Sequence, residues 1–278
     1  MKKINRRSFL AAAGLTAAAL ALTACGGSAS STASSTASSA ASSEAASTSA
    51  AAELTTVEAG KLTMATNAAF PPYEMTTDAG EFEGIDIDTA KAIAEKLGLE
   101  LQIDDMDFDA ALLSVQQGKA DIVMAGVTVT DERKAVMDFS DSYATGIQSI
   151  IVPESSDITS PDDLAGKKIG TQRGTTGYIY CSDDFGDDAV VAYDDGLTAV
   201  QALNNGQVDA VVIDNAPAKE FVAANPGLVI LDTSYAEEDY AIGLAKGSAL
   251  EDAVNATLEE LKADGTLQSI VDKYITAE

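Results

Sequence analysis

Beyond residue 58, two spacings of apolar positions alternate along the chain. Residues 86–97 have apolar side chains every three or four positions, which is helical spacing, and Gly98 follows as a stop signal. Residues 61–66 have the shorter pattern of a strand. Further strands are predicted at 99–103, 120–125, 148–152, 168–171 and 208–213, and further helices at 110–117, 130–137, 162–165, 198–205, 250–264 and 267–274. This alternation predicts an α/β fold with mostly parallel sheets.

One unit of this pattern occurs twice. Residues 111–126 and 199–214 each contain an apolar-faced helix, a glycine stop, an aspartate and a hydrophobic strand, offset by 199 − 111 = 88 residues. The repetition indicates two similar lobes, although such units also recur in α/β proteins of other kinds. Open α/β sheets bind ligands beyond the carboxyl ends of their strands. Those ends carry residues that would face a shared cleft: Asn67, Gly126, Gln172 and Asp214.

The first 24 residues have the pattern of an export signal. Basic residues precede an apolar run at 9–24, which is 16 residues long and short for a membrane span. The run ends in LTAC at 22–25, which resembles a bacterial lipobox and implies that Cys25 is lipidated. The alternative is an ordinary secretory signal with a chance cysteine. The sequence RRSFL at 6–10 also resembles a twin-arginine signal, so the export route stays open.

A low-complexity stretch follows the signal. Residues 26–53 consist almost entirely of serine, alanine and threonine. Such a segment cannot bury enough apolar surface to offset its ordering entropy. We therefore expect 25–57 to be a lipidated cysteine with a flexible tether, which anchors an extracytoplasmic protein to the outer face of the cytoplasmic membrane.

Charge and composition exclude several classes of function. The chain has 17 basic and 44 acidic residues, a net charge of −27, which disfavours nucleic acid and anionic membrane faces as partners. It has no histidine, which removes Ser-His-Asp and Cys-His catalysis and histidine-ligated zinc. We expect no metal and no cofactor. If Cys25 carries lipid, Cys181 has no intrachain disulfide partner and is interpreted as a small buried hydrophobe.

A series of ordered motifs gives a more specific indication. They are ATNAAFPPYE at 65–74, GIDID at 84–88, MDF at 106–108, AGVTVTDER at 125–133, DFS at 138–140, GTT at 174–176 and DAVVID at 209–214. Together they resemble the polar amino-acid substrate-binding proteins of ABC importers, over residues 62–275.

The resemblance implies a periplasmic-binding-protein type 2 fold, in which two α/β lobes joined by two hinge segments close on a ligand. Lobe 1 is expected to comprise 58–146 and 241–278, and lobe 2 to comprise 147–240. The chain would cross between the lobes near 143–147 and 235–240.

A free amino acid carries a carboxylate and an ammonium on one carbon, and the motifs offer a partner for each. Arg133 presents a planar two-pronged donor for the carboxylate, in the first turn of a predicted helix. Its alternative is a surface arginine paired with its acidic neighbours. Asp214 can accept from the ammonium, or it can cap the next helix. The Thr128 hydroxyl and the Gly126 carbonyl can complete the ammonium shell, although Gly126 is also explained by a tight turn.

Other residues have two open interpretations each. Gln172, Thr175 and Thr176 precede a helix of lobe 2 and can donate to the carboxylate or cap that helix. Three aromatic residues can pack along the ligand or only in the core: Phe70, Tyr73 and Phe108. Glu74 is interpreted as structural.

The ligand class follows from what the side-chain pocket lacks. Asn67 stands where some relatives carry an acidic residue, and no lysine or histidine accompanies it. With Arg133 committed to the α-carboxylate, a second carboxylate would be buried without a cation. A neutral or cationic polar L-amino acid is therefore expected, with arginine or lysine favoured and glutamine open. Ile213 and the direction of Arg173 leave the selectivity undecided.

The same architecture is also compatible with functions other than capture. A few proteins of this architecture are dehydratases acting on cyclic acids, and a ligand-sensing or adhesin lipoprotein would have the same tether. The pairing of Arg133 with Asp214 favours capture over chemistry, so no catalytic residue is assigned and the chain is interpreted as a non-enzyme. The expected partners are a free amino acid and the membrane permease of an ABC importer, with the protein itself a monomer.

Overall fold

A computed structural model describes residues 54–275, which belong to a single structural unit. The predicted signal at 1–24, Cys25 and most of the tether at 25–57 lie outside the described residues. None of the described helices is long and apolar enough to cross a membrane.

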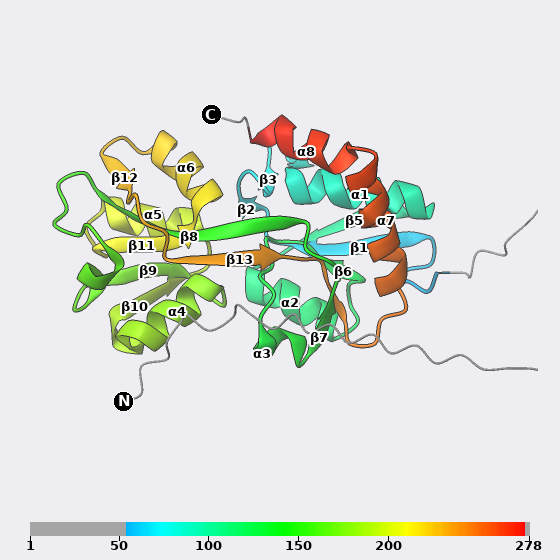
Figure 1. The fold of residues 1–278 in the computed structure, drawn as a ribbon, viewed down its shortest axis with the longest axis horizontal. Helices are drawn as coiled ribbons and strands as arrows, with labels where there is room; N and C mark the ends of the chain where they lie inside the picture. The colour runs from blue at the N-terminus through cyan, green and yellow to red at the C-terminus, as the bar shows by residue number, and fades with distance from the viewer. Residues whose placement is uncertain (1–53, 276–278) are drawn as a thin grey trace, which may run out of the picture. The chain divides into compact units, whose positions relative to one another are not determined.

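The first sheet has five strands and is built from both ends of the described chain (Figure 1). Its order is β5 (Glu100–Asp105), β1 (Lys61–Thr66), β6 (Ile122–Val123), β14 (Gly243–Ala245) and β7 (Met137–Phe139). The predicted strand at 61–66 is confirmed, and it pairs in parallel with β5 and β6. β14 pairs antiparallel with β6 and β7.

The second sheet has six strands. Their order is β10 (Val190–Tyr193), β9 (Ile169–Gln172), β11 (Ala210–Asp214), β8 (Ala144–Pro153) and β12 (Leu228–Ile230), and β13 (Ala236–Tyr240) also pairs with β8. β9 is parallel to both β10 and β11, whereas all pairings of β8 are antiparallel. The α/β class is confirmed, but both sheets are mixed rather than mostly parallel.

Helices pack on both sheets. On the first sheet, α1 packs on β5 and against α7 and α8, while α2 packs on β1 and β14. On the second, α4 and α5 pack on β9 and β11, and α6 packs on β8 and β12. The bounds are α1 (Ile85–Leu97), α2 (Phe108–Gln116), α3 (Asp131–Lys134), α4 (Thr176–Phe185), α5 (Gly196–Asn204), α6 (Asn215–Ala224), α7 (Glu251–Ala263) and α8 (Thr266–Tyr274).

The amphipathic spacing of α1 explains its packing. Ile87, Ala90, Ile93 and Ala94 are buried, and Gly98 ends the helix in the left-handed region at a φ of 70°. Where a glycine follows, as at Gly118, Gly206 and Gly265, the helix ends within one or two residues of the predicted position. The helix predicted at 130–137 is shorter than predicted: α3 ends at Lys134, and residues 137–139 form β7.

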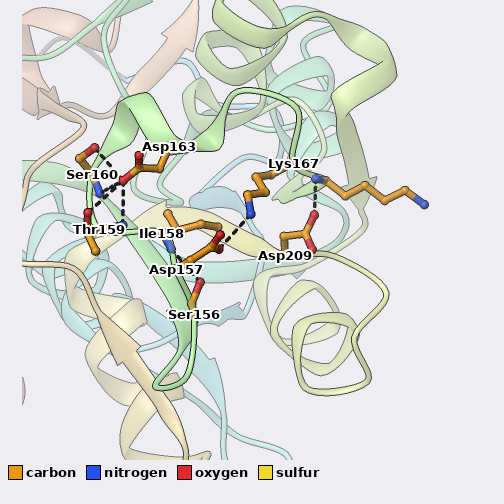
Figure 2. A network of polar contacts seen from close by, with 9 residues as sticks. Ser156, Asp157, Ile158, Thr159, Ser160, Asp163, Lys167 and Asp209 are labelled. Atoms are coloured by element: carbon orange, nitrogen blue, oxygen red, sulfur yellow. Dashed lines mark hydrogen bonds and ion pairs between the residues drawn. The ribbon is translucent and has the colours of Figure 1, made fainter.

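The connection before β9 is held by side-chain caps (Figure 2). Asp163 Oδ2 accepts from the backbone N–H and the hydroxyl of both Thr159 and Ser160, each at 3.0 Å. These bonds fix the start of the 3₁₀ helix η1 (Pro161–Leu164), where a short helix was predicted. A second 3₁₀ helix, η2 (Asp187–Ala189), precedes β10.

Two strands run side by side between the sheets. Residues 144–148 of β8 pair antiparallel with residues 236–240 of β13, at the positions where the chain was predicted to cross (Figure 1). After Tyr240 the chain returns to the first sheet as β14.

A third, three-stranded antiparallel sheet packs against α1. It consists of β2 (Ala69–Phe70), β3 (Glu74–Thr76) and β4 (Phe82–Glu83). Phe70 and Glu74 are direct cross-strand partners, which places an aromatic ring and a buried carboxyl group next to each other.

Candidate ligand-binding site

The ends of four strands surround a small cavity. Its lining residues are Asn67, Phe70, Glu74, Phe108, Ala125, Gly126, Thr128, Gln172, Thr175, Thr176 and Asp214. Asn67, Gln172 and Asp214 are at the carboxyl ends of β1, β9 and β11, as the strand-end rule predicts. The cavity volume is about 10 Å³, which accommodates about one water molecule. An amino acid therefore needs the walls to move apart.

Direct hydrogen bonds join residues of the two sheets around this cavity. Gln172 Nε2 donates to Asn67 Oδ1 at 2.8 Å, and the hydroxyl oxygens of Thr128 and Thr176 lie 3.5 Å apart. Asn67 Nδ2 also donates to the Met106 carbonyl at 2.9 Å. The cleft is closed in this structure.

Arg133 lies next to the cavity, although it is not part of the lining. Thr130 caps its helix by accepting from the Arg133 N–H. Its guanidinium donates to the carbonyls of Thr128 at 2.7 Å and Gly174 at 3.1 Å, and it lies over the Phe108 ring at 5.4 Å. Burial lowers the pKa of Arg133, while nearby carboxylates oppose that shift. The side chain is 8% exposed, so the surface alternative is wrong.

Asp214 is buried at the end of β11 and lines the cavity. It occupies the N-cap position of α6, but its side chain makes no cap hydrogen bond, so the capping alternative is wrong. Its carboxylate instead accepts from Gln148 Nε2 at 2.9 Å and from the Tyr240 hydroxyl. Burial raises the pKa of Asp214 to about 7, with a further rise from Glu238, and these two hydrogen bonds oppose the shift.

Glu238 of β13 is a central polar group that the sequence analysis missed. Its Oε2 accepts from the hydroxyls of Thr128 at 3.2 Å and Thr176 at 2.9 Å, and from Gln148 Nε2 at 3.0 Å. The sequence signal that could have identified it is the alternation of residues 236–240, a strand pattern that places Glu238 and Tyr240 on the same, buried face. Glu238 thereby links the crossing strands to the cavity wall.

The three candidate donors at the end of β9 and the start of α4 have different roles. Thr175 caps α4 by accepting from the Tyr178 N–H, and its hydroxyl donates to the Gln172 carbonyl, so its capping interpretation is confirmed. Thr176 donates to Glu238, as described above. Gln172 bonds to Asn67 across the cleft and to the Asp194 carbonyl at 3.3 Å.

The three aromatic residues that were predicted to contact the ligand lie in two different places. Phe70 and Phe108 line the cavity. Tyr73 lines a different groove, and its ring lies 5.9 Å from that of Phe70 and edge-on to Tyr240 at 5.3 Å. Tyr73 therefore buttresses Phe70 instead of lining this cavity.

Glu74 is fully buried and lines the cavity. Behind it, Asp86 Oδ2 accepts from the Gly126 N–H at 3.0 Å and the Tyr143 hydroxyl at 2.8 Å. Gly126 has a φ of 55°, and a Cβ there would lie 2.9 Å from the Phe70 ring. Both the tight turn and the close approach require glycine at this position.

Two residues that left selectivity undecided lie away from the cavity lining. Arg173 is 52% exposed in its side chain and contacts Asp194 at 3.5 Å. Ile213 is buried in the hydrophobic core. Cys181 is also fully buried in a core of the second sheet. Among the described residues, no cluster of three acidic or cysteine side chains is arranged to hold a metal ion.

Comparison with known proteins places these features in a family. Residues 62–277 match the model of bacterial extracellular solute-binding proteins, family 3. A probable histidine-binding protein of Neisseria gonorrhoeae is 32% identical, over 99% of this chain and 98% of that protein. An arginine-binding extracellular protein, ArtP of Bacillus subtilis, is 32% identical over 78% of this chain and 87% of its own.

Solved structures agree. The arginine-, lysine-, histidine-binding protein ArtJ of Geobacillus stearothermophilus has a TM-score of 0.75 and 34% identity, covering 78% of this chain and 96% of that one. The match in sequence and in fold confirms the resemblance carried by the ordered motifs. The chain belongs to the bacterial extracellular solute-binding proteins of family 3.

Proposed function

We propose that this protein captures a free polar L-amino acid outside the cytoplasm and delivers it to the membrane permease of an ABC importer. The observation that carries the proposal is the pair of buried opposite charges beside one cavity, Arg133 and Asp214. Relatives named for binding histidine, arginine and cystine support the ligand class.

The two poles of an amino acid have separate partners in this arrangement. Asp214 and the Thr128 hydroxyl accept from the α-ammonium. The guanidinium of Arg133 now donates to the carbonyls of Thr128 and Gly174. An α-carboxylate is a better acceptor than either carbonyl because its bonds to a guanidinium are charge-assisted and bidentate. A ligand would therefore take over the hydrogen bonds that Arg133 makes with the protein.

The groups around the ligand side chain favour a cation. The cavity lining contains Glu74 and Asn67 but no lysine, arginine or histidine. Arg173, the only other basic residue considered for this pocket, contacts Asp194 at the surface. The rings of Phe70 and Phe108 suit a guanidinium or an ammonium. We propose a cationic or neutral polar ligand, with arginine or lysine favoured over glutamine, and we assign capture rather than catalysis.

Ligand entry requires the cleft to open. We propose two lobes, one of 58–146 with 241–278 and the other of 147–240, that separate by bending at the paired strands β8 and β13. Hinge closure is a common response of periplasmic binding proteins. A lipid on Cys25 would keep the monomeric protein at the outer face of the membrane, close to its permease.

Calorimetry with arginine, lysine, glutamine, glutamate and aspartate tests the ligand class. We expect arginine or lysine to bind, with glutamine weaker or absent, and the two acids to give no heat of binding. A ligand at 100 times its Kd should also stabilise the folded protein by about 2.7 kcal/mol. Tight binding of glutamate alone would refute the assignment and would require a cation in the side-chain pocket.

A further inference from the structure

Two carboxyl groups meet behind the aromatic wall of the cavity. Glu74 of β3 and Asp86 in the first turn of α1 are both fully buried. Asp86 Oδ2 has two donors, the Gly126 N–H and the Tyr143 hydroxyl. The Asp86 N–H donates to the carbonyl of Tyr73, the residue before Glu74, at 2.9 Å, so the two residues are neighbours. Both oxygens of Glu74 and Oδ1 of Asp86 are buried without a hydrogen-bond partner. A proton held between the two carboxyl groups would give these oxygens a partner.

The surroundings of this pair contain no compensating cation. The titratable groups that face it are Tyr73, Tyr143, Asp105 and Asp214, from the β2–β3 turn, the start of β8, β5 and β11. All of them are neutral or negative. Burial and the neighbouring carboxylates hold the pKa of Glu74 well above its usual range, and burial raises the pKa of Asp86 to about 6. A doubly ionised pair is therefore unfavourable in the closed protein.

Building on the proposed function, we infer that Glu74 and Asp86 share one proton, which a cationic ligand side chain displaces and a neutral one leaves in place. Glu74 lines the cavity and would contact the ligand, whereas Asp86 stands behind it as a positioning residue. The pair therefore makes the preference for cationic over neutral ligands depend on pH.

The proton balance differs between two ligands of the same shape. Before binding, the pair carries one proton and a charge of −1. A guanidinium of charge +1 leaves the site at −1 if the pair releases its proton to the buffer and becomes −2. A neutral ureido group, as in citrulline, keeps the shared proton, because a protonated carboxyl group can donate to the ureido oxygen.

Linkage then fixes the sign of the pH dependence. Below the pKa at which the pair loses its shared proton, arginine affinity should rise about tenfold per pH unit, since each binding event expels about one proton. The affinity for citrulline should not change with pH through this pair, because citrulline binding leaves the shared proton in place. Asp214 contacts the α-ammonium of both ligands, so any proton that it releases cancels in the comparison. The ratio of arginine to citrulline affinity isolates the pair.

Titration calorimetry of the folded protein with arginine and with citrulline tests the inference. At each pH from 5 to 8, two buffers of different ionisation enthalpy give the number of protons released. At the acidic end we expect arginine to release about one more proton than citrulline, and the affinity ratio to increase by about tenfold per unit until the pair ionises. Equal proton release by both ligands, or a flat ratio, would overturn the inference while leaving amino-acid capture intact.

Two variants complete the test. Glu74→Gln removes the shared proton, so the difference in proton release should vanish and the affinity ratio should lose its pH dependence. Glu81→Gln makes the same change at an exposed position between β3 and β4. It should leave the difference in proton release and the pH dependence of the affinity ratio as they are in the wild-type protein. Circular dichroism checks that each variant folds. Binding of glutamine but of neither arginine nor citrulline at any pH would overturn this inference alone, whereas binding of no polar amino acid would refute the proposed function as well.

Discussion

Replacing Asp214 by asparagine should weaken amino-acid binding and, at the same time, stabilise the ligand-free protein. The carboxylate is buried and accepts from Gln148 and Tyr240, while Glu238 adds a second negative charge nearby. An amide of the same shape keeps an acceptor for Gln148, and the Tyr240 hydroxyl can rotate to accept from the amide. The substitution therefore removes charge without opening a cavity.

The two effects can be estimated separately. The rise of the Asp214 pKa from 3.8 to about 7 corresponds to an upper limit of about 4 kcal/mol for holding the ionised carboxylate in the folded state. The substitution should recover part of this. A ligand ammonium that loses its counter-ion stays buried and unpaired, which costs about 3–5 kcal/mol, or about 100-fold or more in Kd.

The pH dependence gives the stability prediction a sign. Because the folded-state pKa of Asp214 is raised, the wild-type protein loses stability as pH rises from about 4 to about 7. The Asp214→Asn variant has no carboxyl group to ionise at this position, so its stability should not fall with pH for this reason. The stability difference should be near zero at pH 4 and should reach its plateau above pH 7.

Urea unfolding at pH 4, 6 and 8 without ligand measures the stability difference, and calorimetry at pH 8 measures the affinity. A variant that is no more stable than wild type at pH 8 would contradict the account of the buried charge. Wild-type affinity in the variant would place the ammonium site elsewhere. A variant that fails to fold would contradict the predicted gain in stability.

Three further predictions concern carboxylate binding, the lipid anchor and closure of the cleft. Arg133→Lys keeps a positive charge but loses the two-pronged donor, so it should fold and bind amino acids about tenfold to 1,000-fold more weakly by calorimetry; unchanged affinity would show that the carboxylate lies elsewhere. Cys25→Ala should move the protein from the membrane fraction to the medium in a fractionation experiment, and retention in the membrane would refute the lipid anchor. The radius of gyration from small-angle scattering should fall when saturating arginine is added, because the cleft closes; no change would contradict hinge closure.

The sequence predicted the strand-end residues of the site well. Gln172 and Asp214 end the parallel neighbours β9 and β11, which brings them to one edge of the second sheet, so local pattern was sufficient for these two. Asn67 follows β1 of the first sheet and meets Gln172 only across the cleft. Nine of the eleven residues that line the cavity had been predicted, the exceptions being Glu74 and Ala125.

The missed residues depend on contacts between distant parts of the chain. Glu238 and Gln148 are 90 positions apart and meet only because β13 pairs with β8. Glu74 became significant only once Asp86 was placed behind it. The mixed character of the sheets was missed for a related reason, since hydrophobic periodicity identifies a strand but not the direction of its neighbour.

The position of β14 has a consequence for the order of assembly during synthesis. This strand lies inside the first sheet, between β6 and β7, but it is made after every strand of the second sheet. A growing chain can form the second sheet while β6 and β7 still lack the strand between them. Completion of the first sheet must therefore wait until Ala245 has been synthesised, so the half of the molecule that begins first is finished last.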